Sequence, residues 1–203
     1  MSTYAGAKAA YKELRDAIGP WAKANGFLRT KGTQANWEKP VDPDQLLRFM
    51  FEGYSMVNPD TGNSYHGYVQ LEPRVTSTGE IVRQSSFSCC LVQAELDELA
   101  RVQGAINARR PPLPDYLRDH FDRDTILGHG LREEYDPAPK CREGEIVYFR
   151  YHSLDDARDL AAFIARVLPQ ALDCFLQGRV VKPISTTPPH LIPKFFRSLG
   201  DKP

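Results

Sequence analysis

Alternating apolar and polar residues predict a β-sheet in residues 45–92. The apolar residues on one face of the first run share a spacing of two: Leu47, Phe49 and Phe51. This period is typical of a half-buried strand. The runs 65–75 and 82–92 repeat the alternation, and stretches rich in turn-forming residues separate the runs. The pattern therefore predicts an antiparallel meander, to which short runs at 34–39 and 145–151 add further strands.

Apolar spacings of three and four predict helices at residues 4–25, 93–108, 115–121 and 154–177. Pro20 should kink the first helix or split off its last turn. The last helix follows Ser153, which with Asp155 and Asp156 resembles a capping box. Residues 122–144 lack a clear period and are expected to form a long surface connection.

These elements predict an α+β fold, with an antiparallel meander sheet of about four to five strands packed against an N-terminal helix and a long C-terminal helix. Residues 1–179 are expected to form a single α+β domain, since a chain of this size can bury a substantial core. Residues 180–203 are rich in proline and are expected to form an extended C-terminal tail. Apolar residues of the tail could dock on a groove of the same chain or of a second copy, which would give a homodimer.

The chain carries no net charge, because 26 basic residues balance 26 acidic residues. A neutral domain has no overall field to attract nucleic acid or an anionic membrane. No stretch approaches the roughly 18 apolar residues that a membrane helix needs, and the N-terminus lacks the pattern of a signal peptide. We therefore expect a cytoplasmic protein.

The cysteines show no metal-binding or redox spacing and are expected to be free thiols: Cys89, Cys90, Cys141 and Cys174. Cys89 and Cys90 are adjacent in a predicted strand and should point to opposite faces. Packing in the core is the favoured interpretation of both thiols. His66 is expected to be an ordinary histidine on the sheet surface.

Acidic residues gather between positions 115 and 136, although the chain as a whole is neutral. The set comprises Asp115, Asp119, Asp122, Asp124, Glu133, Glu134 and Asp136. A helix and a loop that project these carboxylates together would steer association with a basic partner. Arg118, Arg123 and Arg132 are interspersed, so local pairing could cancel much of this field, and an ordinary solvated surface remains the alternative. The segment is the predicted partner-binding site.

The densest group of potential metal ligands lies in residues 119–129, and the candidates are His120, Asp122, Asp124 and His129. They match no established ligand motif, so a solvated surface is the favoured interpretation and a metal-dependent hydrolase is the alternative. No cofactor is predicted, since the glycines form no phosphate-binding motif. No catalytic triad can be assembled from the sequence either.

The first helix supplies a second alternative, because one of its faces is basic. This face carries Lys8, Lys12, Arg15 and Lys23, with Tyr11 and Trp21 nearby. Such a helix could contact phosphates in a nucleic-acid accessory protein. A solvated helix face is favoured, since the neutral chain lacks the signature of a nucleic-acid module.

A further pattern spans residues 14–37. A helix ends in Gly26-Phe27, a basic stretch follows at residues 29–31 with Gly32, and Trp37 opens a strand. In these packing features the chain resembles the bacterial domain-of-unknown-function family 4304. They carry over no catalytic residue. The resemblance implies a small cytoplasmic bacterial protein, of a kind that can occur as the immunity partner of a secreted toxin.

The sequence therefore predicts a non-enzymatic bacterial binding protein, one form of which is an immunity protein that occludes a cognate toxin by protein–protein contact. The hydrolase and the nucleic-acid accessory protein remain the alternatives.

Overall fold

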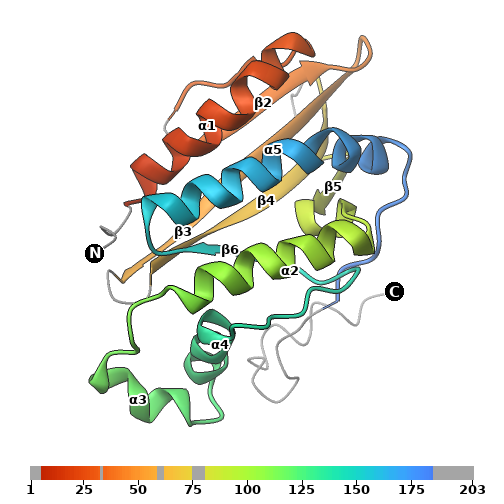
Figure 1. Ribbon diagram of the computed structural model, residues 1–203. Helices are drawn as coiled ribbons and strands as arrows, with labels where there is room; N and C mark the ends of the chain where they lie inside the picture. The colour runs from red at the N-terminus through yellow and green to blue at the C-terminus, as the bar shows by residue number, and fades with distance from the viewer. Residues whose placement is uncertain (1–5, 33, 59–61, 75–80, 185–203) are drawn as a thin grey trace.

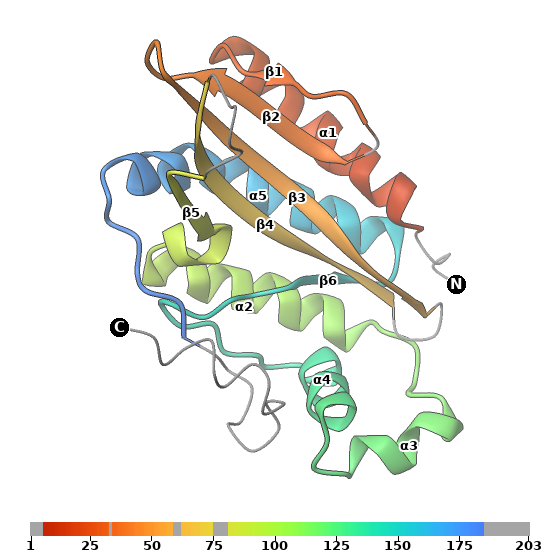
Figure 2. The ribbon, with the colours of Figure 1, turned by 180° about the vertical axis from the view of Figure 1, so that it is seen from behind.

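The computed structural model describes residues 6–32, 34–58, 62–74 and 81–184 of the chain. An antiparallel sheet forms one layer, helices α1 and α5 cover one of its faces, and α2 lies beside α5 (Figure 1). Among the described residues, the opposite face of the sheet carries no helix (Figure 2). This arrangement confirms the predicted α+β fold with an N-terminal and a C-terminal helix.

The strands are β1 (Leu28–Arg29), β2 (Ala35–Pro40), β3 (Gln45–Asn58), β4 (Gly62–Pro73), β5 (Arg83–Ser86) and β6 (Phe149–Tyr151). Strands β1 to β5 neighbour one another in chain order, which confirms the meander. β6 pairs with β4 as well, at the end of β4 that β5 does not reach. Every pair is antiparallel.

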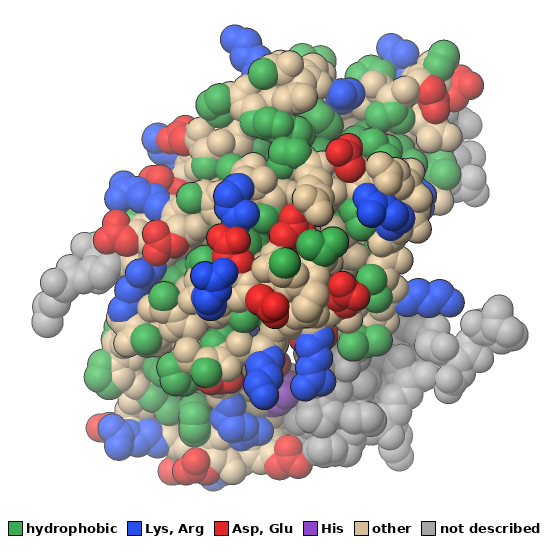
Figure 3. Space-filling model, turned by 45° about the vertical axis from the view of Figure 1, so that its right-hand side comes forward, with side chains coloured by type: hydrophobic (Ala, Val, Ile, Leu, Met, Phe, Trp, Pro, Cys, Tyr) green, Lys and Arg blue, Asp and Glu red, His purple; other side chains and the backbone are tan. Residues whose placement is uncertain are grey.

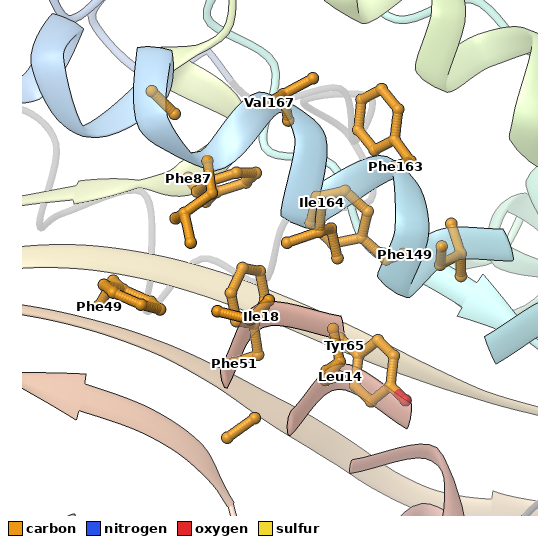
Figure 4. Close-up of a cluster of buried hydrophobic side chains, with 14 of the residues drawn as sticks. Leu14, Ile18, Phe49, Phe51, Tyr65, Phe87, Phe149, Phe163, Ile164 and Val167 are labelled. Carbon is orange, nitrogen blue, oxygen red and sulfur yellow. The ribbon is translucent and has the colours of Figure 1, made fainter. Parts of the chain in front are cut away.

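The hydrophobic core lies between the sheet and the helices (Figure 4). Leu47, Phe49 and Phe51 are all buried, which confirms the predicted inward face of β3. Phe49 stacks on Trp37 of β2, with ring centroids 5.1 Å apart. The facing side chains come from α1 and α5 and include Leu14, Ile18, Ile164 and Val167.

The outer face of the sheet is polar at its centre. Arg48 of β3 reaches Glu38 of β2 and Glu72 of β4, with nitrogen–oxygen distances of 2.9 Å to both carboxylates. One guanidinium group therefore links three adjacent strands on the side away from the core.

The helices are α1 (Ala7–Ala24), α2 (Gln93–Ala108), α3 (Asp115–Phe121), α4 (Ile126–Tyr135) and α5 (Leu154–Leu176). The predicted bounds of α2 and α3 are confirmed residue by residue. α1 continues through Pro20 as one helix, so no last turn is split off. The capping box of α5 is confirmed, since the Ser153 hydroxyl accepts from Asp156 N and the Asp156 carboxylate accepts from Ser153 N.

Two strands are shorter than predicted. β5 ends at Ser86, and residues 87–90 form a 3₁₀ helix in place of the second half of the predicted strand. β6 begins only at Phe149. The two irregular segments meet at Ser88, whose Oγ donates to Glu145 O at 2.7 Å and accepts from Val147 N at 3.1 Å. A side-chain hydroxyl thus satisfies backbone groups that a regular strand pair would otherwise satisfy.

The start of the predicted tail runs along the domain. Val181 N donates to Cys89 O at 3.2 Å, and Ile184 N donates to Gly144 O at 2.7 Å. Residues 185–203, including the apolar residues expected to dock, lie outside the described residues. In the described part of the chain, no helix has both the length and the apolar character that crossing a membrane requires.

Candidate functional site

The predicted acidic segment folds into two short helices, α3 and α4, which project from the rest of the molecule (Figures 1 and 2). We call residues 115–135 the hairpin. The prediction of a surface connection over residues 122–144 is wrong, because residues 126–135 form α4. Thr125 caps this helix, with its Oγ1 accepting from Gly128 N at 3.1 Å. The two glycines in the first half of α4 weaken the helical signal in the sequence.

One arginine side chain links α4 to the end of α3. Arg132 of α4 donates from Nη1 to the carbonyl oxygen of Phe121, at 2.6 Å, and to that of Arg123, at 3.0 Å. These carbonyls lie at the end of α3 and just beyond it, where no intrahelical donor remains. The guanidinium group therefore pairs with backbone carbonyls and, among the described residues, forms no ion pair with an exposed carboxylate, although its charge still adds to the field of the hairpin.

Five of the seven predicted acidic residues are exposed: Asp115, Asp119, Asp122, Asp124 and Asp136. Asp115 forms an ion pair with Arg118 at 2.9 Å, and Asp136 accepts from Ala138 N at 2.9 Å. The exposed basic residues of the hairpin are Arg118 and Arg123. Carboxylates outnumber them, so the exposed surface of the hairpin is acidic.

The other two predicted residues, Glu133 and Glu134, turn towards the body of the protein. The Glu133 carboxylate binds Arg150 of β6 through one oxygen, and its other oxygen lies 3.1 Å from His129 Nε2. Glu134 lies 4.0 Å from Arg110, whose side chain is only 1% exposed. Burial raises the pKa of Glu134, and the nearby guanidinium groups oppose that shift. These two glutamates position the hairpin and are not part of its exposed acidic surface.

Two amides of α2 hold the end of α4 in place. Asn107 donates from Nδ2 to Asp136 O at 2.7 Å and to Glu133 O at 3.3 Å. Gln103 donates to the side chain of Asn107 at 3.0 Å and exchanges two hydrogen bonds with the backbone of Arg150, at 2.9 and 3.0 Å. Both amides are buried. Nothing in the local sequence pattern of α2 indicates this role, because the groups that they bind lie far along the chain.

A cavity of about 320 Å³ lies between the hairpin and the body. His129 and Glu133 line it from α4, Gln103 lines it from α2, and Tyr148 and Arg150 line it from β6 and the segment before it. The hairpin is therefore incompletely packed against the domain on this inner side.

The hairpin exposes two large apolar residues, and we call its solvent-exposed surface the outer side. Tyr116 of α3 is 60% exposed and Leu127 of α4 is 44% exposed. The sequence places Tyr116 among the apolar residues of its helix, but only Leu117 is buried there. The exposed carboxylates of the hairpin belong to α3 and to the connection between α3 and α4, so the same hairpin carries both kinds of exposed side chain.

The four candidate metal ligands do not come together. Among the described residues, no three side chains of the ligand types His, Cys, Asp and Glu are close enough to hold a metal ion. Asp122 and Asp124 point to solvent, whereas His129 contacts Glu133. The geometry gives no support to the hydrolase alternative.

The basic helix α1 keeps Lys8 and Lys23 exposed, but its other predicted contact residues are engaged within the protein. Lys12 forms an ion pair with Asp16. Tyr11 is buried and accepts a hydrogen bond from Gly53 N, and the Trp21 ring packs on Phe27 at 5.7 Å. Neither ring is presented for stacking on a base. In the face drawn in Figure 3, acidic and basic side chains are interspersed without a continuous patch of either sign.

The four cysteines are free thiols and all are buried, as expected. The prediction that Cys89 and Cys90 lie on opposite faces of a strand is wrong, because both belong to the 3₁₀ helix. Burial raises the pKa of Cys90 to about 12 and that of Cys141 to about 11. Such thiols are poor nucleophiles at neutral pH.

His66 is more enclosed than its predicted place on the sheet surface implies. It is 5% exposed, its Nε2 lies 3.1 Å from Ser86 Oγ, and its ring lies between Tyr68 and Tyr148, at 4.1 and 5.1 Å. Burial lowers the pKa of His66 to about 4. The ring is therefore a neutral packing residue at physiological pH.

In comparisons with known proteins, no family model, curated protein or solved structure matches the chain. The resemblance of residues 14–37 to family 4304 stays a prediction.

Proposed function

We propose that the protein acts by binding a partner protein through the outer side of the hairpin. The observation that carries the proposal is the combination of Tyr116 and Leu127, both exposed, with the exposed carboxylates of Asp119 on α3 and of Asp122 and Asp124 in the connection between the two helices. Exposed aromatic and aliphatic anchors surrounded by charge are characteristic of protein interfaces.

The charge of the hairpin specifies the kind of partner. Its exposed carboxylates outnumber its exposed guanidinium groups, so a basic protein surface is electrostatically complementary to it. The charge would accelerate encounter, and the apolar side chains would supply most of the affinity once water is excluded. A nucleic acid or an anionic membrane would be repelled by this surface.

An immunity protein is one specific form of the proposal, in which the hairpin covers a basic surface of a cognate toxin in the bacterial cytoplasm. The resemblance to family 4304 is what supports this form. The buried thiols and the dispersed candidate ligands favour binding over catalysis, since neither a reactive cysteine nor a metal site emerges from the described residues.

Site-specific photo-crosslinking tests the proposal. A photoreactive phenylalanine analogue placed at Tyr116 should capture one partner from the lysate of the source organism, and added wild-type protein should compete with the capture. The same analogue at Val41, in the turn before β3, is the matched control because it is also exposed. Capture from both positions alike, or from neither, would refute the hairpin as the binding surface.

A further inference from the structure

The hairpin is separate from the hydrophobic core. The core cluster draws residues from α1, α2, α5, the sheet and the 3₁₀ helix, but none of its described members comes from α3 or α4. Leu117 and Leu131 are buried within the hairpin region and lie outside that cluster. The apolar contacts of the hairpin are therefore largely its own, and they can survive if it moves away from the body.

Polar contacts join the hairpin to the body. We call them the clamp: Asn107 to the carbonyl of Glu133 and to that of Asp136 directly after the hairpin, Arg150 to the Glu133 carboxylate, and Arg110 beside Glu134 and the Tyr135 ring. Water can replace each of these contacts when the hairpin separates, so the clamp costs less to open than an apolar interface of the same size. The cavity between α4 and the body further reduces the packing at this interface.

The pair of Arg110 and Glu134 in the clamp is not strongly stabilising. Arg110 is buried, and burial lowers the pKa of its guanidinium group just as burial raises that of Glu134. Both shifts oppose the charged pair, which is the expected behaviour when desolvation outweighs a distant attraction. The two groups regain their hydration if the hairpin opens.

The connections at both ends of the hairpin are rich in proline. Pro111, Pro112 and Pro114 precede α3, and Pro137 and Pro139 follow α4. Proline has no amide hydrogen to donate, which limits the hydrogen bonds that can tie these connections to the body, and its fixed φ makes them stiff spacers. Pro137 packs closely on α2, since a Cβ added to Gly104 would lie 2.6 Å from its carbonyl oxygen. A movement of the hairpin on this side must therefore take place between α4 and Pro137.

We infer that the hairpin opens from the body as one unit while the core stays folded, and that the clamp sets how often it opens. Opening exposes the cavity and the inner side of α4. A partner that prefers either state would shift the balance between them. Only this regulatory use rests on the proposed function, because the opening itself requires no partner.

Hydrogen exchange of the whole chain, measured by mass spectrometry without any partner, tests the inference. In the wild type, peptides from α3 and α4 should exchange at a common rate at least about tenfold faster than peptides from α5. Glu133→Gln should accelerate the exchange of both hairpin helices by about three- to tenfold and leave α5 unchanged. Glu13→Gln is the matched control, since it weakens a pair with Arg158 that joins α1 to α5 and should not affect the hairpin.

Three outcomes would overturn the inference. The hairpin peptides could exchange as slowly as α5, the two hairpin helices could exchange independently, or Glu133→Gln could accelerate α5 as much as the hairpin. Unchanged exchange in α5 shows that the variant is folded. Failure of the crosslinking experiment alone would refute the proposed function and leave the opening intact, so the two proposals can be separated.

Discussion

Gly128 of α4 lies directly against the backbone of His120 in α3. A Cβ added to Gly128 would come within 2.4 Å of the His120 carbonyl oxygen and within 2.2 Å of the Arg123 carbonyl oxygen. Both neighbours are backbone atoms, which cannot move aside as a flexible side chain can. The closeness of α3 and α4 therefore depends on a residue without a side chain at this position.

We expect Gly128→Ala to loosen the hairpin. Overpacking of this kind costs about 1–3 kcal/mol, and the cost should appear as faster hydrogen exchange in α3 and α4. Gly130→Ala is the control in the same helix, because nothing lies within 4 Å of a Cβ added there. That substitution should leave the hairpin unchanged or stabilise it by up to about 1 kcal/mol through higher helix propensity. Equal effects of the two substitutions would show that the close contact is not formed.

The sequence predicts the parts of the fold that local pattern determines. The apolar spacing of α2 and α3 gives their bounds, and Ser153 with Asp156 marks the start of α5. The alternation through Phe49 identifies the buried face of β3. In each case the signal comes from residues close together in the chain, and the structure uses them in the same way.

Where contacts distant in sequence decide the conformation, the predictions are wrong. Residues 85–90 are all buried, so a pattern of buried and exposed positions cannot distinguish a strand from a 3₁₀ helix there. The hydrogen bonds of Ser88 to residues far along the chain favour the 3₁₀ helix. Helix α4 is difficult to predict because Gly128 and Gly130 lower its helix propensity, although Gly128 is what allows it to pack on α3. Tertiary packing overrides local preference in both places.

The candidate site shows the same division. The acidic character of residues 115–136 can be read from the sequence, but the direction of each carboxylate cannot. Glu133 and Glu134 turn inward because Arg150 and Arg110, which come from other elements, lie behind α4. Tyr116 is likewise exposed because none of the described elements packs over it, and the local sequence does not show this.

His66 should make stability depend on pH. Its pKa in the folded protein, about 4, lies below the ordinary value near 6.5. The unfolded chain therefore binds the proton more tightly than the folded protein. The free energy of unfolding should fall as the pH decreases from about 6.5 to about 4 and below, by about 3 kcal/mol in all. Urea unfolding at pH 7 and at lower pH should show a smaller loss for His66→Gln than for the wild type.

A histidine on the hairpin supplies the control for that measurement. His120→Gln makes the same substitution at a partly exposed imidazole group. If the two variants lost stability to the same extent on acidification, the result would contradict the conclusion that His66 is neutral in the folded protein.

The thiols should be unreactive in the folded protein. Cys90 and Cys141 are buried, with raised pKa values of about 12 and about 11, and the thiolate is the reactive form. We expect the folded protein to react with a disulfide reagent at least about 100-fold more slowly than the urea-unfolded chain, in which all four thiols should react. A single rapidly reacting thiol in the folded state would contradict this and favour a catalytic cysteine.

The dissociation constant of the crosslinked partner, measured by titration calorimetry with purified proteins, tests the central claim most directly. Asp119→Lys with Asp122→Lys reverses two exposed charges of the hairpin, and Asp42→Lys with Asp173→Lys makes the same change at exposed positions elsewhere. The hairpin variant should bind about tenfold or more weakly, and the control variant should bind within about twofold of the wild type at moderate salt. Equal affinities for the two variants would contradict binding through the acidic hairpin.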